Sequence, residues 1–243
     1  MSGYNNNTNK TIGTLFIAGA IGIFVPYTIL TAIFDYPDVL RQDTATVLLK
    51  FHEGGGALIW TWFAFAITGL PLLPAYILLG RMLERKTPLA RIATTMGVIG
   101  LIIQMIGLLR WTFVVPVLAD TFVSTTDEIT RTAAIVAFET IHQFAGVMLG
   151  EHLGQLFTIA WTVMIAMALR RLKAIPAWVS YLAYVASGIY VFAQAELFAT
   201  VIPSFPVWEL AGFLGSTLWL MCLVILGIYL LRTKGLLDFN SQI

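Results

Sequence analysis

The side chains best suited to chemistry in this sequence are its histidines and the carboxylates near them. Glu139 and His142 are three residues apart, so on a helix both lie on one side. Glu-x-x-His pairs of this kind bind metal in carboxylate-bridged di-metal bundles. A single pair is short enough to occur by chance. The pair therefore indicates a candidate metal site, with an exposed polar helix end as the competing interpretation.

Two further pairs add imidazole and carboxylate groups, the ligands that suit iron, copper or zinc. The predicted metal ligands are His142, Glu139, His152, Glu151, His52 and Glu53. The cofactor stays open between a transition metal (Fe, Cu or Zn), haem b and none, in which case the groups make structural hydrogen bonds. His142 and His152 lie about 15 Å apart along a continuous helix, so they cannot share one metal unless the helix breaks. A single haem between His52 and one of them remains an alternative.

Arg110 is a charge within a long apolar stretch, where it needs a partner or a ligand. Glu151, Glu196 or Glu139 could supply a carboxylate for ordinary pairing. The sharper alternative is binding of an anionic head group or substrate. Arg110 and Glu196 are therefore predicted to bind a ligand or to pair charges. No residue is identified as catalytic, and whether the protein is an enzyme stays open.

The elements that must position these groups are membrane helices. Hydrophobic residues make up 58% of the 243 residues and charged residues 11%, against about 25% charged in soluble domains. Spanning a bilayer takes about 20 apolar residues in a helix. Six stretches qualify, at about 11–34, 57–80, 92–119, 133–169, 177–202 and 208–231. The sequence predicts an all-α polytopic transmembrane bundle of about six helices, with residues 1–243 forming a single transmembrane domain.

The basic residues predict the orientation. Of fourteen, ten lie before the first stretch, in the second and fourth loops, and in the C-terminal tail, and three lie in the odd-numbered loops. By the positive-inside rule both termini are expected in the cytoplasm, which requires an even number of helices. All three histidines then fall in the outer half, and the polar cluster is expected near the outer face.

The fourth stretch is too long for a simple span. Residues 133–169 would extend about 55 Å as a helix, whereas the hydrocarbon is about 30 Å thick. We expect this helix to bend or break between Gly146 and Gly154, or to project beyond the bilayer. Its glycines, spaced by four, would also permit close helix packing.

Three stretches carry a family resemblance. They are Arg110-Trp111-Thr112-Phe113-Val114-Val115-Pro116, Phe138-Glu139-Thr140-Ile141-His142-Gln143, and Gly150-Glu151-His152-Leu153-Gly154. Together they resemble an uncharacterised group of bacterial six-helix membrane proteins, known as a domain of unknown function. The resemblance implies a multi-pass protein of the bacterial inner membrane with this topology. It implies no activity.

Three functions remain open. The protein binds a metal or haem; or it is a non-catalytic subunit of a larger membrane complex or a homo-oligomer; or it is a small-molecule transporter or a lipid- or small-molecule-binding protein that uses Arg110. Few polar residues are expected to be buried in the cytoplasmic half, which argues against a transport path. The lipid bilayer is the expected partner, and a net charge of +1 gives no basic field for nucleic acid.

Overall fold

The computed structural model describes residues 2–233, and the side chains of residues 7–233. Helices make up all the regular structure in this part of the chain, and no strand occurs in it. The elements are α1 (Ser2–Phe34), the 3₁₀ helix η1 (Asp38–Arg41), α2 (Thr44–Ile67), α3 (Leu72–Glu84), α4 (Leu89–Phe113), α5 (Val115–Ser124), α6 (Glu128–Ile141), the π-helix η2 (His142–Leu153), α7 (Gly154–Arg171), α8 (Ala177–Phe192), α9 (Gln194–Ala199) and α10 (Ala211–Arg232).

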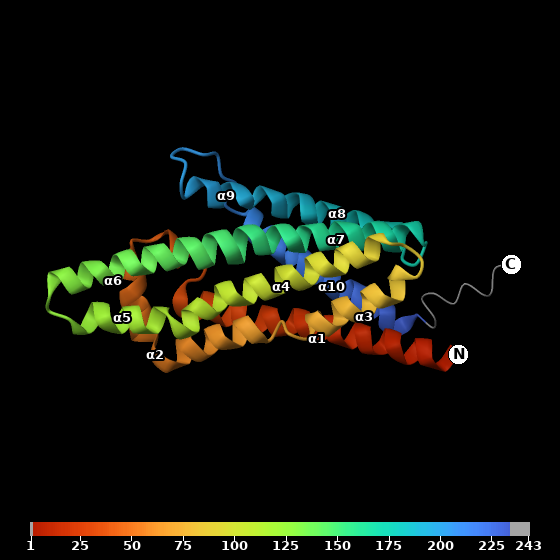
Figure 1. The fold of residues 1–243 in the computed structure, drawn as a ribbon, viewed down its shortest axis with the longest axis horizontal. Coiled ribbons are helices and arrows are strands. Elements are labelled where there is room, and N and C mark those ends of the chain that lie inside the picture. The colour runs from red at the N-terminus through yellow and green to blue at the C-terminus, as the bar shows by residue number, and fades with distance from the viewer. Residues whose placement is uncertain (1, 234–243) are drawn as a thin grey trace. The chain divides into compact units, whose positions relative to one another are not determined.

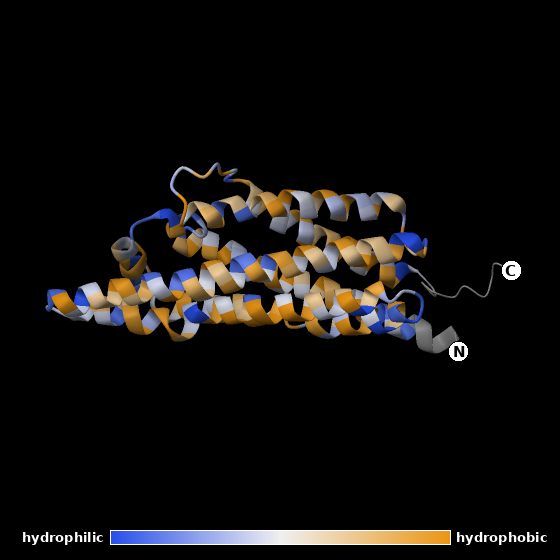
Figure 2. Ribbon diagram, turned by 45° about the horizontal axis from the view of Figure 1, so that its top comes forward, coloured by the Kyte–Doolittle hydropathy of each residue, from blue (hydrophilic) through white to orange (hydrophobic). Residues whose placement is uncertain are grey.

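Six helical runs are long and apolar enough to cross a membrane, which confirms the predicted all-α bundle. Figure 2 shows apolar residues along the length of each of them. The runs are Asn7–Phe34, Thr44–Glu84, Leu89–Ser124, Glu128–Arg171, Ala177–Ala199 and Ala211–Arg232. The chain is therefore a multi-pass membrane protein in contact with lipid.

The second run begins at Thr44, well before the expected start at residue 57. Its polar first part was not expected to be helical, but the Asp43 side chain caps it by accepting from the Thr46 backbone N–H at 3.0 Å. Hydrogen bonds from the Thr46 hydroxyl and backbone lower the pKa of the Asp43 carboxyl, so the cap is charged at neutral pH. Further along α2, Gly55 kinks the helix with φ of +53°, a conformation that glycine adopts without steric cost.

The fourth run is helical without interruption from Glu128 to Arg171. In place of a break, its hydrogen bonding changes from the α to the π pattern over His142–Leu153. This π segment includes Gly146 and Gly150, in the region where the sequence predicted a bend or break. The whole run of 44 residues, Glu128–Arg171, would extend about 66 Å as a regular α-helix. Projection beyond the bilayer therefore stays a prediction.

The chain forms two compact units. Unit 1 contains the chain up to Ile21, Gly69–Leu101, and the chain from Gly154 onward. Within it, α8 packs against α7 and α10 (Figure 1). The beginning of α1 lies against the end of α10, because a Cβ on Gly13 would contact the Gly227 carbonyl. These two ends of the membrane bundle therefore lie on the same side of unit 1.

Unit 2 contains Gly22–Thr68 and Ile102–Leu153. Here α5 packs between α2 and α6 (Figure 1). The centre of this unit is aromatic: the fully buried rings of Trp62 and Trp111 stack with centroids 4.7 Å apart and planes 11° apart. Phe34 and Phe51 contact the Trp111 ring at centroid distances of 5.6 Å. This cluster holds the end of α4 in place.

Replacing Trp62 by alanine should lower the free energy of unfolding by about 3–5 kcal/mol, because it leaves a cavity in this cluster. Trp60→Ala is the matched control on the same helix, since the Trp60 side chain is 69% exposed. That control should change the free energy by no more than about 0.5 kcal/mol. Reversible unfolding in detergent micelles measures both, and equal losses would contradict the packing described here.

Candidate functional site

Arg110 is the charged residue that organises unit 2. It lies near the end of α4 and is only 6% exposed. Its Nη1 donates to the Gly107 carbonyl oxygen at 2.5 Å, and its guanidinium lies 5.2 Å from the centroid of the Trp111 ring. The buried Nε has no hydrogen-bond partner in the described part of the chain. The guanidinium is therefore held between helices without its full set of acceptors.

Two glycines of η2 allow η2 and α4 to approach closely, and the first of them leaves space for this guanidinium. A Cβ on Gly146 would collide with the Arg110 guanidinium. One helical turn further on, Gly150 lies directly against Gly107, where a Cβ on Gly107 would come within 2.7 Å of the Gly150 Cα. Small residues at such positions let helix backbones approach closely. The predicted role of these glycines in close packing therefore matches the contacts observed.

His142 is the nearest imidazole to Arg110, with 3.4 Å between Arg110 Nη2 and His142 Nδ1. Arginine has only donors, so Nδ1 must be the acceptor. The proton of the neutral imidazole is then on Nε2, which remains a donor. The His142 ring stacks on the Phe138 ring, with the two centroids 5.4 Å apart. It also packs edge-to-face against the Trp111 ring, with the two centroids 6.1 Å apart. These contacts fix both the position of the ring and its tautomer.

His142 also lines a cavity of about 130 Å³ in unit 2. The wall combines polar and apolar side chains from η1, the beginning of α2, α6 and η2. It consists of Leu40, Gln42, Thr44, Val47, Phe138, Glu139, His142 and Gln143. The Thr44 hydroxyl donates to Glu139 Oε1 at 2.9 Å, which joins the α2 side of the cavity to the α6 side. The expected placement of Glu139 and His142 on one side of the helix matches this arrangement.

The other predicted site residues are distributed differently. Glu151 interacts electrostatically with Arg110 and is half-buried. His52 and Glu53 are exposed on α2, just before the kink at Gly55. His152, in η2, is half-buried. Glu196 lies on α9 in unit 1. The structure thus places His142 against Arg110, Glu151 within electrostatic range of Arg110, and Glu139 at the same cavity as His142.

Metal and haem binding have no direct support in this geometry. Within the described residues, no group of three or more His, Cys, Asp or Glu side chains is arranged to hold a metal ion. The cavity is also well below the roughly 300–1,000 Å³ typical of pockets for drug-sized ligands, so haem b does not fit it. A ligating histidine usually donates its second N–H to a carboxylate or carbonyl. His142 instead accepts from Arg110 at that position.

The sequence did not single out Gln42, Thr44 or Gln143. Gln143 follows His142 directly and lies within one of the stretches that carry the family resemblance. Gln42 and Thr44 reach the cavity through tertiary contacts, such as the hydrogen bond from Thr44 to Glu139, which no local pattern reveals. Their polarity in an otherwise apolar chain was the only available signal.

Comparison with known proteins identifies the family to which the chain belongs. The chain belongs to the family of the domain of unknown function DUF4386. The family model matches residues 11–227, which include every residue of the cavity and Arg110. This confirms the resemblance seen in the sequence. No curated protein and no solved structure matches the chain.

Replacing Gly146 by alanine should destabilise the protein by about 1–3 kcal/mol, because the added methyl group collides with the Arg110 guanidinium. In a protein that already carries Arg110→Ala, the Gly146→Ala substitution should lower the free energy of unfolding much less. Gly188→Ala is the control, since a Cβ there meets nothing within 4 Å. It should be neutral or slightly stabilising. Thermal unfolding of the four variants measures these differences, and an equal cost of Gly146→Ala in both backgrounds would rule out the contact.

Proposed function

We propose that this protein is a membrane-embedded binding protein for a small polar molecule, or for a lipid head group with the same chemistry. The observation that carries the proposal is the cavity in unit 2, whose wall contains an imidazole of fixed tautomer and, one helical turn before it, a carboxylate. The bound group is one that carries an ammonium or hydroxyl beside a hydrogen-bond acceptor. This is the third of the functions left open by the sequence.

The wall of the cavity has partners for both the donor and the acceptor of such a ligand. Because Arg110 occupies His142 Nδ1, the Nε2–H donor is left for an acceptor on the ligand. Within the described residues the Glu139 carboxylate accepts one hydrogen bond, from Thr44, and a carboxylate has about four lone-pair sites. An ammonium or hydroxyl of the ligand would use the remaining sites. Gln42 and Gln143 provide amides that can donate or accept.

The size of the cavity limits the ligand. An engineered cavity of about 150 Å³ in another protein binds benzene, so about 130 Å³ suits a molecule or head-group fragment of about six non-hydrogen atoms. Phe138, Val47 and Leu40 supply an apolar wall for a short carbon chain. An ethanolamine group combines an ammonium, a two-carbon chain and an oxygen acceptor within this size.

The location of the cavity supports a ligand at the membrane surface. Its rim adjoins the charged, exposed residues Asp38, Arg41 and Asp43, which require water or lipid head groups. By the positive-inside rule we place this end of the bundle outside the cytoplasm and both termini inside. From the family resemblance we take the membrane to be the inner membrane of a bacterium. Phospholipid head groups and external solutes would both reach the cavity there.

Metal binding is the competing function, and Arg110 argues against it. A metal at His142 Nε2 would displace the only ring proton while Nδ1 still accepts from Arg110, so the ligand would have to be a fully deprotonated imidazole. Stoichiometric Fe, Cu or Zn in the purified protein, lost on His142→Ala and His152→Ala together, would nevertheless establish the metal function.

Ethanolamine should bind the purified protein in nanodiscs of phosphatidylcholine, measured by calorimetric titration. The Glu139→Gln variant should bind at least tenfold more weakly, because it removes the carboxylate charge while keeping an oxygen that can accept from Thr44. The matched control is Glu128→Gln on the same helix, whose carboxylate pairs with Arg131 at 3.2 Å. This control should bind like the unaltered protein.

A second arm separates the two sources of the ligand. Nanodiscs containing phosphatidylethanolamine should weaken the binding of free ethanolamine if the lipid head group occupies the same cavity. Unchanged binding would identify a free solute as the ligand. Failure of ethanolamine to bind in either lipid, or equal binding by Glu139→Gln, would refute the proposal.

The orientation is tested by cysteine labelling in intact cells. The native Cys222 is buried, and Cys222→Ala removes its background. In that background Thr126→Cys, in the α5–α6 loop, should react with a membrane-impermeant maleimide. Lys86→Cys, exposed in the α3–α4 loop, should react only after the cells are lysed. The reverse pattern would invert the proposed topology.

A further inference from the structure

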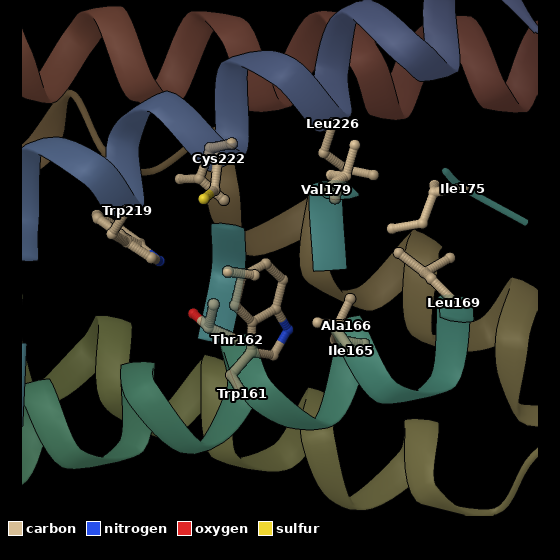
Figure 3. A pocket seen from close by; sticks show the side chains of 12 residues that line it. Trp161, Thr162, Ile165, Ala166, Leu169, Ile175, Val179, Trp219, Cys222 and Leu226 are labelled. Carbon is tan, nitrogen blue, oxygen red and sulfur yellow. The ribbon is translucent and has the colours of Figure 1, made fainter. Parts of the chain in front are cut away.

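Helix α8 of unit 1 has two sides with different surroundings. Its inner side carries Val179 and Ala183, which line a groove between α7, α8 and α10 whose wall is almost entirely apolar (Figure 3). The opposite side carries Tyr181, Val185 and Phe192, which are 51%, 56% and 61% exposed. Residues at these spacings lie along one face of a helix. Because α8 belongs to a run that is long and apolar enough to cross the membrane, this outer side faces lipid.

The segment after α9 continues the exposed apolar surface. It runs from Thr200 to Leu210 as an irregular loop between α9 and α10 (Figure 1), and ten of its eleven residues are exposed. The Trp208 ring packs edge-to-face against the Phe192 ring of α8, with the two centroids 6.1 Å apart. The loop is therefore joined to the lipid-facing side of α8. Its exposed large apolar side chains are Val201, Ile202, Val207, Trp208 and Leu210.

The lengths of the adjoining helices place this loop at the membrane surface. Ala177–Ala199 has 23 residues and Ala211–Arg232 has 22, which correspond to about 35 Å and about 33 Å of helix. The hydrocarbon is about 30 Å thick, and a bilayer with its head groups about 40–45 Å. Lys173 and Arg232 mark the opposite ends of the two spans with charges. Spans of this length end within the head-group layer, so the loop that joins them lies there and not in bulk water.

The composition of the loop suits this layer. Tryptophan is enriched at membrane interfaces, because its ring is apolar and its N–H is polar. Pro203 and Pro206 have no backbone N–H, so the loop has fewer donors to satisfy where water is scarce. Residues 194–210 contain two carboxylates and no lysine or arginine. Attraction of basic side chains to anionic lipids therefore contributes nothing here, and the apolar side chains remain as the driving force.

We propose that the loop Thr200–Leu210 inserts into one leaflet of the bilayer and anchors unit 1 at the boundary between head groups and acyl chains. Its partner is phospholipid, irrespective of head-group charge. Val201 and Leu210 contact the first carbons of the acyl chains, and the Glu209 carboxylate stays among the head groups. The anchor is formed by unit 1 alone, so it does not depend on the ligand of the cavity in unit 2.

A second copy of this chain is the other candidate for covering the loop. Such an interface would withdraw the loop from lipid while the outer side of α8 remained in contact with it. Phe192 and Trp208 belong to one continuous apolar surface, however, and that surface faces lipid along the rest of α8. This continuity and the short spans together favour lipid.

The experiment uses the full chain in phosphatidylcholine nanodiscs, with Cys222→Ala to remove the native thiol. A fluorophore is attached to Val201→Cys or Val207→Cys in the loop. Phospholipids with a nitroxide on carbon 5 of an acyl chain should quench both labels at least threefold more than a label at Thr126→Cys, in the exposed α5–α6 loop. Val185→Cys on the outer side of α8 is the positive control for lipid contact. Aqueous iodide should quench the Thr126→Cys label most.

Two changes test the physical basis of the insertion. Val201→Glu adds a charge to the loop and should lower the nitroxide quenching at Val207→Cys at least twofold, because a charge is unfavourable among acyl chains. The matched control is Ile129→Glu, at an exposed position of α6, which should leave this quenching unchanged. Adding phosphatidylglycerol to the nanodiscs should also leave it unchanged, since the loop has no basic residue.

Two outcomes would overturn the anchor. Iodide quenching of the loop labels as strong as that at Thr126→Cys, without quenching by the nitroxide lipid, would place the loop in water. Protection of the loop labels from both quenchers would show that protein covers the loop, from a second copy or from another chain.

Discussion

The burial of one guanidinium is the constraint on which the arrangement of unit 2 depends. A charge inside a membrane protein requires compensating contacts, and Arg110 obtains them from the Gly107 carbonyl, the Trp111 ring and His142. Each contact limits another element: Gly146 can have no side chain, and the Trp111 ring must remain stacked on Trp62. The aromatic cluster, the glycines of η2 and the orientation of the imidazole therefore follow from a single buried charge.

The π-helix is the part of the backbone that meets this constraint. His142, Gly146 and Gly150 are spaced by four, and all three face α4: the first two contact Arg110 and the last contacts Gly107. The π pattern begins at His142, immediately after the α-helical turn that holds Phe138 and Glu139 at the cavity. Such segments occur often at functional sites. Here the change of helix type lies at the boundary between the cavity and the contact with the guanidinium.

Much of the fold could be predicted from the sequence, because in a membrane the length of an apolar run nearly determines a helix. The spacing of Glu139 and His142 likewise predicted a shared side of one helix. The metal interpretation rested on residue types and on one short Glu-x-x-His spacing. The distances between His52, His142 and His152 depend on tertiary packing that no spacing encodes. For the same reason no sequence pattern revealed that an arginine lies against His142. The early start of α2 depended on a single cap at Asp43.

The arginine gives the candidate site a fixed hydrogen-bond polarity. A histidine whose Nδ1 faced a carboxylate would present a lone pair at Nε2, which suits a metal or a proton donor. With Arg110 behind it, His142 presents a donor, while Glu139 on the preceding turn presents acceptors. The two groups at the cavity thus differ in polarity because one is paired with a guanidinium and the other with a hydroxyl. A ligand that carries both a donor and an acceptor can satisfy them at once, and a bare cation or a bare anion can satisfy only one. The selectivity of the cavity would therefore originate in Arg110, a residue that does not line it.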